Sequence, residues 1–412
     1  MNFSSRYEVT VAAKCTACGM CTEYCALGIL SIDGERAKAN EAIQCNGCCA
    51  CVDVCPVQAI TVRELGDKAA DEPFYMGDEI RVFISRLLEA SNVPGEEAQI
   101  VAASLLEAEL RGITSHGLAR LAGYLKRIAS GLMLPATAFK VIKNNGVISV
   151  CDAANGWGQV AGQRAMELCL AKAKDFGVGI ATVCRSNHFG TASFFTLQAS
   201  RAGFIGLAAG NAGPSMAAWG GRKPVLGSNP ISMALPSPWG DFCVDMALTS
   251  VAKSKIRLAV MEERPIPSNW AIDAKGIPTL NPLAALEGTL QPVGGAKGYA
   301  AALLIDFLSG VLSGAAYASD VRGTFDYRGA SNIGQFFMAI NPEFFMEPEE
   351  FRKRVADWAA KIKAGDNEVR LPGERKAKIR AENEIRGLRL STKTKEGLEI
   401  LAKELDVPIP WE

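Results

Sequence analysis

The chain has 412 residues, with 44 basic and 44 acidic side chains, 13 cysteines, only two histidines and 49% hydrophobic residues. A zero net charge without a basic block argues against a nucleic-acid binder, whose affinity would come from clustered Lys and Arg. Ordinary apolar content with 21% charged residues argues against a disordered chain, and the length predicts two or three domains with a large core.

The cysteines are concentrated near the N-terminus. Nine of the 13 lie in residues 1–66, and the others are Cys151, Cys169, Cys184 and Cys243. The first residues, MNFSSRY, lack the apolar segment of a signal peptide. We therefore expect the N-terminal cysteines to be metal ligands in a reducing compartment rather than disulfides, and we expect a cytoplasmic protein.

Eight of these cysteines form a repeated motif. They follow the spacing x2, x2, x3 twice, and matching cysteines lie 30 residues apart. Three thiolates separated by two residues each can hold one cubane cluster, while the fourth ligates the other cluster. The spacing therefore predicts two 4Fe-4S clusters. The ligands of the first are Cys15, Cys18, Cys21 and Cys55, and those of the second are Cys45, Cys48, Cys51 and Cys25.

This segment resembles the bacterial two-cluster ferredoxins, in which a proline follows the last cysteine as Pro56 follows Cys55 here. The resemblance implies a small ferredoxin-like α+β domain over residues 1–63 that relays electrons through its clusters. Two alternatives stay open. The clusters could serve only to stabilise a small domain, or the sites could hold zinc, although a remote fourth cysteine fits a zinc site poorly. We interpret Cys49, which lies between ligands, as a small residue close to a cluster.

Residues 64–75 are mostly polar or small and include Pro73, which predicts a linker. After this linker, apolar residues at helical spacing predict one helix around residues 80–88 and a second over residues 96–110.

Beyond residue 145 the pattern alternates between strands and helices, which predicts α/β organisation. The predicted strands are residues 147–151, 178–183 and 204–209, and the predicted helices are residues 159–176 and 191–202. Gly156 and Gly158 open the first of these helices, but Gly162 comes one residue late for a dinucleotide fingerprint. The second strand also lacks an acidic residue for a ribose, so the sequence argues against a standard Rossmann fold.

Residues 298–318 carry a single charge, Asp306, and are numerous enough to span a bilayer. The segment also contains several Gly, Ser and Ala residues, and no aromatic or basic belt flanks it. We therefore expect a buried helix of a globular core and no membrane span.

Seven ordered motifs indicate a family for the rest of the chain. They are RGITSHG at 111–117 with Arg120, SNHFG at 186–190, WGG at 219–221, GSNP at 227–230, DMA at 245–247, GGAKGY at 294–299 and LPGE at 371–374. With these motifs, residues 76–412 resemble the malate/L-lactate dehydrogenase family, which is unrelated to the Rossmann-type dehydrogenases and has ureidoglycolate, sulfolactate, diketogulonate and cyclic-imine reductase members.

The resemblance implies a multidomain protein whose mixed-sheet α/β nicotinamide-binding domain packs on helices from both chain ends, and a homodimer. Its expected parts are an N-terminal helical part at 76–145, a cofactor-binding α/β part at 146–300 and a C-terminal helical part at 301–412.

Both histidines fall in these motifs, and histidine is the natural proton donor near neutral pH. By resemblance, His116 is the proton donor and His188 is a further site residue. Arg120 is the candidate clamp for a substrate carboxylate, because guanidinium binds carboxylate through two parallel hydrogen bonds. Asp245 would orient a histidine or contact the cofactor.

Further positions match the contacts that family members make with NAD or NADP. They are Ser115, Asn187, Asn229, Asp241, Phe242, Cys243, Val244, Met246, Ala247, Ala296, Lys297, Gly373, Glu374 and Arg375.

These features predict an NAD(P)-dependent oxidoreductase that reduces a 2-oxo acid, or oxidises a 2-hydroxy acid such as malate or lactate. Hydride transfer moves two electrons together, whereas a cluster moves one. We therefore expect a flavoprotein or other redox partner. The alternatives are a cyclic-imine reductase of the same family, a dehydrogenase whose clusters only regulate or stabilise it, and a non-catalytic electron-transfer subunit of a larger redox complex.

Overall fold

The computed structural model describes residues 7–25, 28–40, 45, 50–64, 73–261, 263–365 and 369–411. The chain divides into two compact units. One unit comprises Met1–Pro73 and Val251–Gln291, and the other comprises Phe74–Ser250 and Pro292–Glu412. Each unit is described below by itself.

The N-terminal part of the smaller unit repeats a small set of elements. They are β1 (Tyr7–Val11), α1 (Met20–Tyr24), β2 (Leu30–Asp33), β3 (Arg36–Ala39), α2 (Ala50–Asp53) and β4 (Ile60–Glu64). Strand β1 pairs antiparallel with β4, and β2 pairs antiparallel with β3. Helices α1 and α2 begin 30 residues apart, at 20 and 50, as do strands β2 and β4, at 30 and 60. The repeat in the cysteine spacing is therefore accompanied by a repeat of helices and strands.

The other segment of this unit has its own small core. Its elements are α8 (Lys253–Met261), β13 (Ala271–Ile272), α9 (Pro282–Glu287) and β14 (Thr289–Leu290). Ile256, Ile266 and Trp270 are buried together there, and Asn281 caps α9 by accepting the backbone N–H groups of Leu283 and Ala284.

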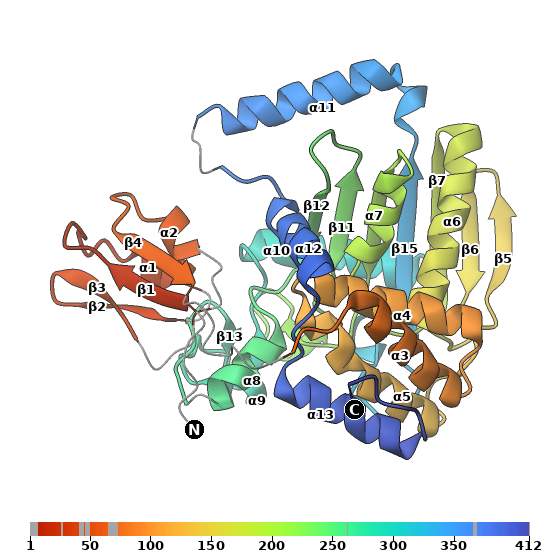
Figure 1. Cartoon of the computed structure of the whole chain (residues 1–412), viewed down its shortest axis with the longest axis horizontal. Helices are drawn as coiled ribbons and strands as arrows, with labels where there is room; N and C mark the ends of the chain where they lie inside the picture. The colour runs from red at the N-terminus through yellow and green to blue at the C-terminus, as the bar shows by residue number, and fades with distance from the viewer. Residues whose placement is uncertain are drawn as a thin grey trace. The chain divides into compact units, whose positions relative to one another are not determined.

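A seven-stranded sheet organises the larger unit (Figure 1). In spatial order its strands are β12 (Phe242–Met246), β11 (Ile231–Leu235), β8 (Ile205–Gly210), β15 (Ile333–Ile340), β7 (Val178–Ser186), β6 (Ile148–Asp152) and β5 (Lys140–Asn145). Strands β6 and β7 are parallel, and the other neighbouring pairs are antiparallel. The predicted mixed sheet is confirmed.

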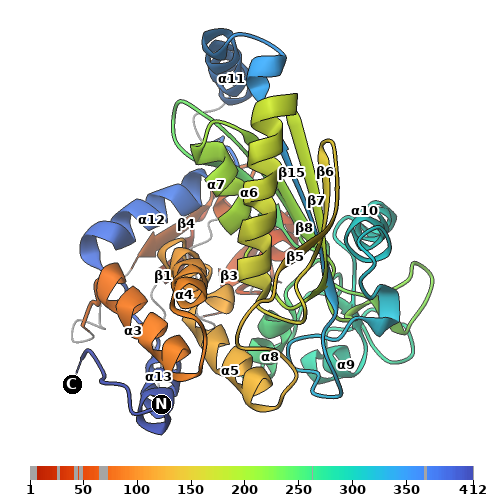
Figure 2. The ribbon, with the colours of Figure 1, turned by 90° about the vertical axis from the view of Figure 1, so that its right-hand side faces the viewer.

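Helices cover both faces of this sheet (Figure 2). Helices α6 (Gly158–Phe176) and α7 (Ser193–Arg201) lie on one side, and α10 (Ala296–Asp306) lies on the other. Successive side chains of a strand point to opposite faces, so Phe337 packs in the core beside α6 while Phe336 packs in the core beside α10. The strands and helices predicted between 147 and 209 are confirmed to within about three residues.

A helical layer contains segments from both ends of the unit, as predicted. Its helices are α3 (Gly77–Ala90), α4 (Gly95–Leu110), α5 (Leu121–Ala129) and α13 (Thr392–Glu404). Ile84, Leu105, Leu121 and Leu398 from these four helices share one buried cluster. The remaining elements are η1 (Thr114–His116), η2 (Leu118–Arg120), β9 (Met216–Ala217), β10 (Pro224–Leu226), η3 (Phe307–Val311), η4 (Ala318–Asp320), η5 (Pro342–Phe344), α11 (Pro348–Lys363) and α12 (Glu374–Arg386).

Two sequence interpretations differ from the structure in the C-terminal third. The part at 301–412, expected to be helical, contributes β15 to the centre of the sheet. The eight residues of this strand, IGQFFMAI, are buried on both faces and lack the alternation of a half-exposed strand. The segment 298–318 is buried on one side only, since Leu304 and Phe307 are more than half exposed. Among the described residues, no helix is long and apolar enough to cross a membrane.

Candidate functional site

The turn after α4 positions His116 and Arg120 through a buried carboxyl group. Oε1 of Glu109 accepts the backbone N–H of Leu118 at 2.8 Å, and a Cβ atom at position 117 would collide with the Glu109 carboxyl. A larger residue at position 117 would have to displace the Glu109 carboxyl from its hydrogen bond with Leu118. The Ser-His-Gly motif thus has a packing reason as well as a chemical one.

His116 and His188 come together in the structure. Their rings stack with centroids 5.5 Å apart and planes 27° apart. Nδ1 of His188 lies 2.6 Å from the hydroxyl of Tyr124 and 3.2 Å from the backbone nitrogen of Gly190. Because a backbone N–H can only donate, Nδ1 of His188 is an acceptor and the proton of the neutral ring is on Nε2.

The electrostatic environment keeps both imidazoles neutral near pH 7. Burial, supported by the charges of Arg120 and Lys376, lowers the pKa of His116 from 6.5 to about 4. Burial and the neighbouring Arg120 also hold the pKa of His188 well below its usual value. Burial raises the pKa of Tyr124 to about 12, so its hydroxyl keeps its proton. The site therefore holds two neutral imidazoles beside positive charge.

Arg120 presents unused donors next to these rings. Its Nε donates to the carbonyl of Ser115 at 2.6 Å, and its guanidinium carbon lies 5.7 Å from the ring centre of Phe325. Within the described part of the chain, neither terminal nitrogen of Arg120 has a hydrogen-bond partner. The hydroxyl of Ser115 lies 3.0 Å from Nδ1 of His116. Two parallel donors remain for a carboxylate.

Asp245 caps a helix. Its Oδ2 accepts the backbone N–H of Ser193, the first residue of α7, at 3.3 Å. A carboxylate at a helix N-terminus satisfies a free amide and interacts favourably with the helix dipole. This contact favours a positioning role for Asp245, because it ties the loop that follows His188 to β12.

The side chains of the segment 241–247, expected to touch the cofactor, differ in their exposure and in their partners. Phe242 and Cys243 are buried in the core, whereas Met246 and Ala247 are exposed. Asp241 forms ion pairs with Arg111 and Arg201. Val244 is half-buried. A cofactor along this strand would thus contact the backbone and the exposed side chains at its end.

Two helix N-termini lie at the two ends of this segment. The backbone N–H of Cys243 donates to the Pro372 carbonyl at 3.1 Å, just before α12, and that of Val293 donates to the Leu248 carbonyl at 3.0 Å, just before α10. Neither helix has a side-chain cap, and each begins after a glycine with positive φ, Gly373 at 98° and Gly295 at 67°.

Uncapped amides at a helix N-terminus suit a phosphate. Ala296, Lys297 and Arg375 stand in these first turns, and none of the three is buried. The residues present therefore fit the pyrophosphate of a nicotinamide dinucleotide.

Three other residues that were expected to contact the cofactor instead bind groups within the protein. The amide nitrogen of Asn187 donates to the carbonyl of Gly156 at 2.9 Å. The side chain of Asn229 joins Ala212 to the Ala302 carbonyl, and Glu374 accepts the N–H of Leu371 and pairs with Lys363. These side chains hold loops in place.

Sequence reasoning missed three residues that the structure brings to the histidines. Tyr124 lies four residues after Arg120, a helical spacing that could have indicated it. Glu109 precedes the motif by two residues, and an acid among the apolar residues of a buried helix was its signal. Lys376 directly follows the residues expected to contact the cofactor, but no pattern in the sequence indicated it.

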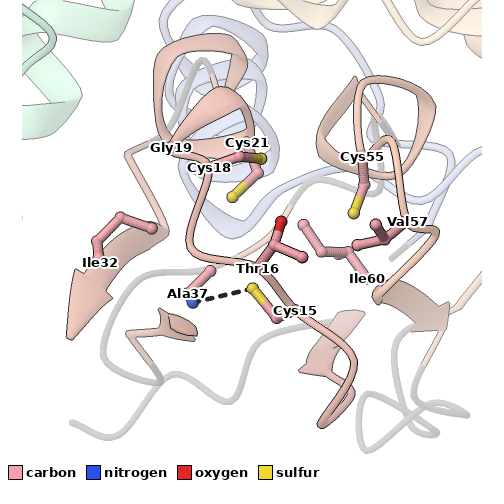
Figure 3. Close-up of a pocket in the computed structure, with 10 residues that line it drawn as sticks. All are labelled: Cys15, Thr16, Cys18, Gly19, Cys21, Ile32, Ala37, Cys55, Val57 and Ile60. Carbon is pink, nitrogen blue, oxygen red and sulfur yellow. Dashed lines mark hydrogen bonds between the residues drawn. The ribbon is translucent and has the colours of Figure 1, made fainter. Parts of the chain in front are cut away.

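The smaller unit gathers four of the predicted cluster ligands (Figure 3). Cys15, Cys18, Cys21 and Cys55 line one pocket, with their sulfur atoms directed into the space between them. Cys15 receives the N–H of Ala37 at 3.3 Å, and Cys55 receives that of Ala59 at 3.1 Å.

The charges in this pocket suit a group that carries positive metal ions. Backbone hydrogen bonds, with that of Ala37 the largest contribution, lower the pKa of Cys15. Burial and the neighbouring thiols raise the pKa of Cys21. Metal ions at the centre would relieve the repulsion among these thiolates, so the donor set fits an iron-sulfur cluster.

The second predicted ligand set is described only in part. Cys25, Cys45 and Cys51 are buried, and Cys25 receives the N–H of Ile29 at 3.4 Å. Cys48 and the extra Cys49 lie outside the described residues, as does most of the predicted linker. In the described ranges, no three His, Cys, Asp or Glu side chains lie close enough to hold a single metal ion.

Comparisons with known proteins match residues 76–399 to one family, malate/L-lactate dehydrogenase. The malate/(S)-sulfolactate dehydrogenase of Methanothermus fervidus is 35% identical over 334 residues, which cover 81% of this chain and 98% of that relative. The L-sulfolactate dehydrogenase of Methanocaldococcus jannaschii is 39% identical over 292 residues, 70% of this chain and 85% of that relative.

Solved structures agree with this match. The sulfolactate dehydrogenase structure from Methanocaldococcus jannaschii aligns with a TM-score of 0.77 at 35% identity, covering 81% of this chain and 98% of that one. The malate dehydrogenase structure from Pyrococcus horikoshii aligns with a TM-score of 0.75 at 32% identity, covering 84% and 99%. The family match begins at residue 76, so the cysteine-rich segment lies outside it.

Proposed function

The chain belongs to the malate/L-lactate dehydrogenase family and is an oxidoreductase, and on that premise we propose that its larger unit is an NAD(P)-dependent dehydrogenase of 2-hydroxy acids. The observation that carries the proposal is the stack of His116 on His188, with ring centres 5.5 Å apart, beside the unused guanidinium donors of Arg120. A carboxylate clamp next to a proton-transfer group is what oxidation at C2 of a hydroxy acid needs.

Arg120 binds the substrate carboxylate through its two terminal nitrogens and so directs the C2 hydroxyl toward the imidazoles. His116 accepts the hydroxyl proton during oxidation and returns it to the carbonyl oxygen during reduction. A nicotinamide bound beside these residues would supply the hydride chemistry at C2. Because the pKa of His116 is lowered to about 4, the ring is unprotonated at neutral pH and can accept the hydroxyl proton.

His188 acts on the same oxygen as a hydrogen-bond donor. Its Nδ1 is occupied by Tyr124 and Gly190, so Nε2–H is the free donor. A neutral donor there polarises the carbonyl and holds the hydroxyl in line with His116. Tyr124 is thus a positioning residue, because it acts through His188.

We propose that the cofactor lies along residues 241–247 with its phosphates near the N-termini of α10 and α12. The uncapped amides of both helices, together with Lys297 and Arg375 in their first turns, support this placement. The buried side chains of Phe242, Cys243 and Asn229 would act indirectly, by holding the backbone in the conformation that contacts the cofactor.

We further propose that residues 1–63 hold two 4Fe-4S clusters that relay electrons to a one-electron partner such as a flavoprotein. Support comes from the pocket lined by Cys15, Cys18, Cys21 and Cys55, from the N–H groups directed at their sulfur atoms, and from the duplicated elements around them. The homodimer and the cytoplasmic location stay predictions.

Anaerobic purification of the full chain followed by steady-state assays tests the dehydrogenase. We expect reduction of NAD or NADP with malate, sulfolactate or lactate, and re-oxidation with the corresponding 2-oxo acids. His116→Ala lowers turnover by about two to four orders of magnitude, while Ser130→Ala, at an exposed residue after α5, leaves it unchanged. Turnover with cyclic imines alone would favour the imine-reductase alternative, and an absence of any turnover would contradict the proposal.

A further inference from the structure

One face of α12 packs against the end of α4 and the turn that follows it. Ile379 lies 3.5 Å from where a Cβ atom at Gly112 would be. The Arg380 Nε donates to a Glu107 carboxylate oxygen at 3.1 Å, and the Asn383 amide donates to the Leu110 carbonyl at 2.9 Å. These three residues of α12 therefore define the face that contacts the histidine-bearing segment.

Lys376 belongs to the same face. It precedes Ile379, Arg380 and Asn383 by three, four and seven residues, which is the spacing of one helical stripe. Asn383 contacts Leu110, and Ile379, one turn nearer the start of α12, lies next to Gly112. Toward the N-terminus of α12, the contacts therefore move forward along the chain that leads to His116. One further turn toward the N-terminus of α12, about 5 Å along the axis, leads to Lys376 and toward the turn that carries His116.

The charge of Lys376 has no acidic partner among the described residues. Two acidic residues of the segments that carry and contact α12 have other partners: Glu374 pairs with Lys363, and Glu107 pairs with Arg111, Arg201 and Arg380. Lys376 is half-buried, and its charge is felt at His116, whose pKa it helps to lower. A half-buried ammonium group without an ion-pair partner in the protein can bind the anionic group of a ligand.

Two positive charges therefore act on the imidazole pair, that of Arg120 at the start of α5 and that of Lys376 on α12. A monocarboxylate such as lactate would neutralise only one of them. A 2-hydroxy acid with a second anionic group, either a carboxylate or a sulfonate, would neutralise both.

We propose that Lys376 binds the distal anionic group of the substrate, so that the site selects dianionic 2-hydroxy acids over monocarboxylates. The inference rests on the proposed dehydrogenase function and assigns the substrate class to one residue. Arg120 holds the carboxylate at C1 next to the reacting carbon, and Lys376 is the specificity-determining residue at the other end of the molecule.

Three variants test this assignment. Lys376→Met removes the charge at nearly constant length, and Lys376→Arg keeps it. Lys378→Met is the matched control, because Lys378 is exposed on the same helix and lies 3.9 Å from Glu382. The measured quantity is the ratio of kcat/KM for malate or sulfolactate to kcat/KM for lactate, together with the KM of the cofactor.

We expect Lys376→Met to lower this ratio by roughly 10- to 100-fold, the effect of losing one charge-assisted contact. Lys376→Arg should largely restore the ratio, and Lys378→Met should leave it as in the parent chain. An equal loss for malate and lactate would overturn the assignment. So would an unchanged ratio with a raised cofactor KM, which would assign Lys376 to a cofactor phosphate instead.

A binding measurement separates failure of this inference from failure of the proposed function. Succinate and butyrate are unreactive here because they lack the hydroxyl group, and calorimetry gives their affinities without turnover. Succinate should bind more tightly than butyrate to the parent chain, and Lys376→Met should remove the difference. Loss of this preference without any turnover in the parent chain would overturn the dehydrogenase proposal alone, whereas equal binding of both acids by the parent chain would overturn the role of Lys376.

Discussion

The hydroxyl of Tyr124 lies 2.6 Å from Nδ1 of His188, on a ring whose proton is on Nε2. The backbone N–H of Gly190 approaches the same nitrogen at 3.2 Å, so two donors converge on one acceptor. Neither residue needs to touch the substrate for this arrangement to matter, since it determines which hydrogen His188 offers to the reacting oxygen.

Replacing Tyr124 with Phe tests this relationship. The variant keeps the ring that packs against Trp157 but leaves Nδ1 of His188 with a single, longer donor. We expect kcat to fall by roughly 10- to 100-fold, with the KM of the cofactor little changed. Tyr317→Phe is the control, because that tyrosine is 51% exposed. A kcat within twofold of the parent value, in a variant with an unchanged melting temperature, would contradict the role of Tyr124.

The pH dependence of oxidation follows from the lowered pKa of His116, which is about 4. A base with a lowered pKa stays unprotonated, and therefore active, as pH falls from neutral toward that value. We expect kcat/KM, corrected for ionisation of the substrate, to fall at low pH. The midpoint of this acid limb should lie nearer pH 4 than pH 6.5. Lys376→Met should move the limb upward because it removes a nearby positive charge. A parent limb at the ordinary histidine pKa would contradict the base assignment.

Stability should depend on the protonation of Glu109. Burial raises its pKa from 4.5 to about 7, so the folded chain keeps a proton that the unfolded chain releases between these values. The contribution of this group is fully present below about pH 4.5 and is lost as pH rises through about 7. It amounts to at most about 3.4 kcal/mol, at roughly 1.36 kcal/mol for each pKa unit.

Glu109→Gln keeps an acceptor for the Leu118 N–H without the titration. Thermal midpoints measured at pH 5 and pH 8 should fall less between these values in Glu109→Gln than in the parent chain. Glu96→Gln, at an exposed position of the same helix, should behave like the parent. Identical pH dependence in all three proteins would show that Glu109 does not titrate in this range.

Cysteine replacement tests the clusters. The anaerobically purified parent chain should contain about eight iron and eight sulfide per chain. Cys55→Ser removes one pocket ligand and should lower both contents by about half, whereas Cys169→Ser, at a buried thiol of α6, should not change them. Zinc in place of iron after anaerobic purification, or an unchanged iron content in Cys55→Ser, would contradict the cluster assignment.

Much of the larger unit could be predicted because its local signals agree. Alternating strand and helix patterns predicted β6, α6, β7, α7 and β8, and both histidines stood in recognisable motifs. Strand β15 could not be recognised, because a mostly apolar run of eight residues buried on both faces has the same pattern as part of a buried helix.

The partners of the site residues could not be read from the sequence. The motifs indicate which residues matter but not what each side chain contacts. Asn229 and Asp241 fall at expected cofactor positions, yet their polar atoms bind the backbone or arginine side chains. Lys376 reaches the region of His116 only because α12 packs on α4, which is a tertiary relationship between segments more than 250 residues apart.

Isotope transfer tests whether this chain moves the hydrogen at C2 of a hydroxy acid to a nicotinamide. The full chain, purified anaerobically, would be given NAD or NADP and malate, sulfolactate or lactate carrying deuterium at C2, and the reduced cofactor would be examined by mass spectrometry. We expect one deuterium in each reduced nicotinamide, and loss of this product in His116→Ala. Oxidation of the substrate without deuterium in the nicotinamide, or no oxidation of any of these acids, would contradict the proposed dehydrogenase.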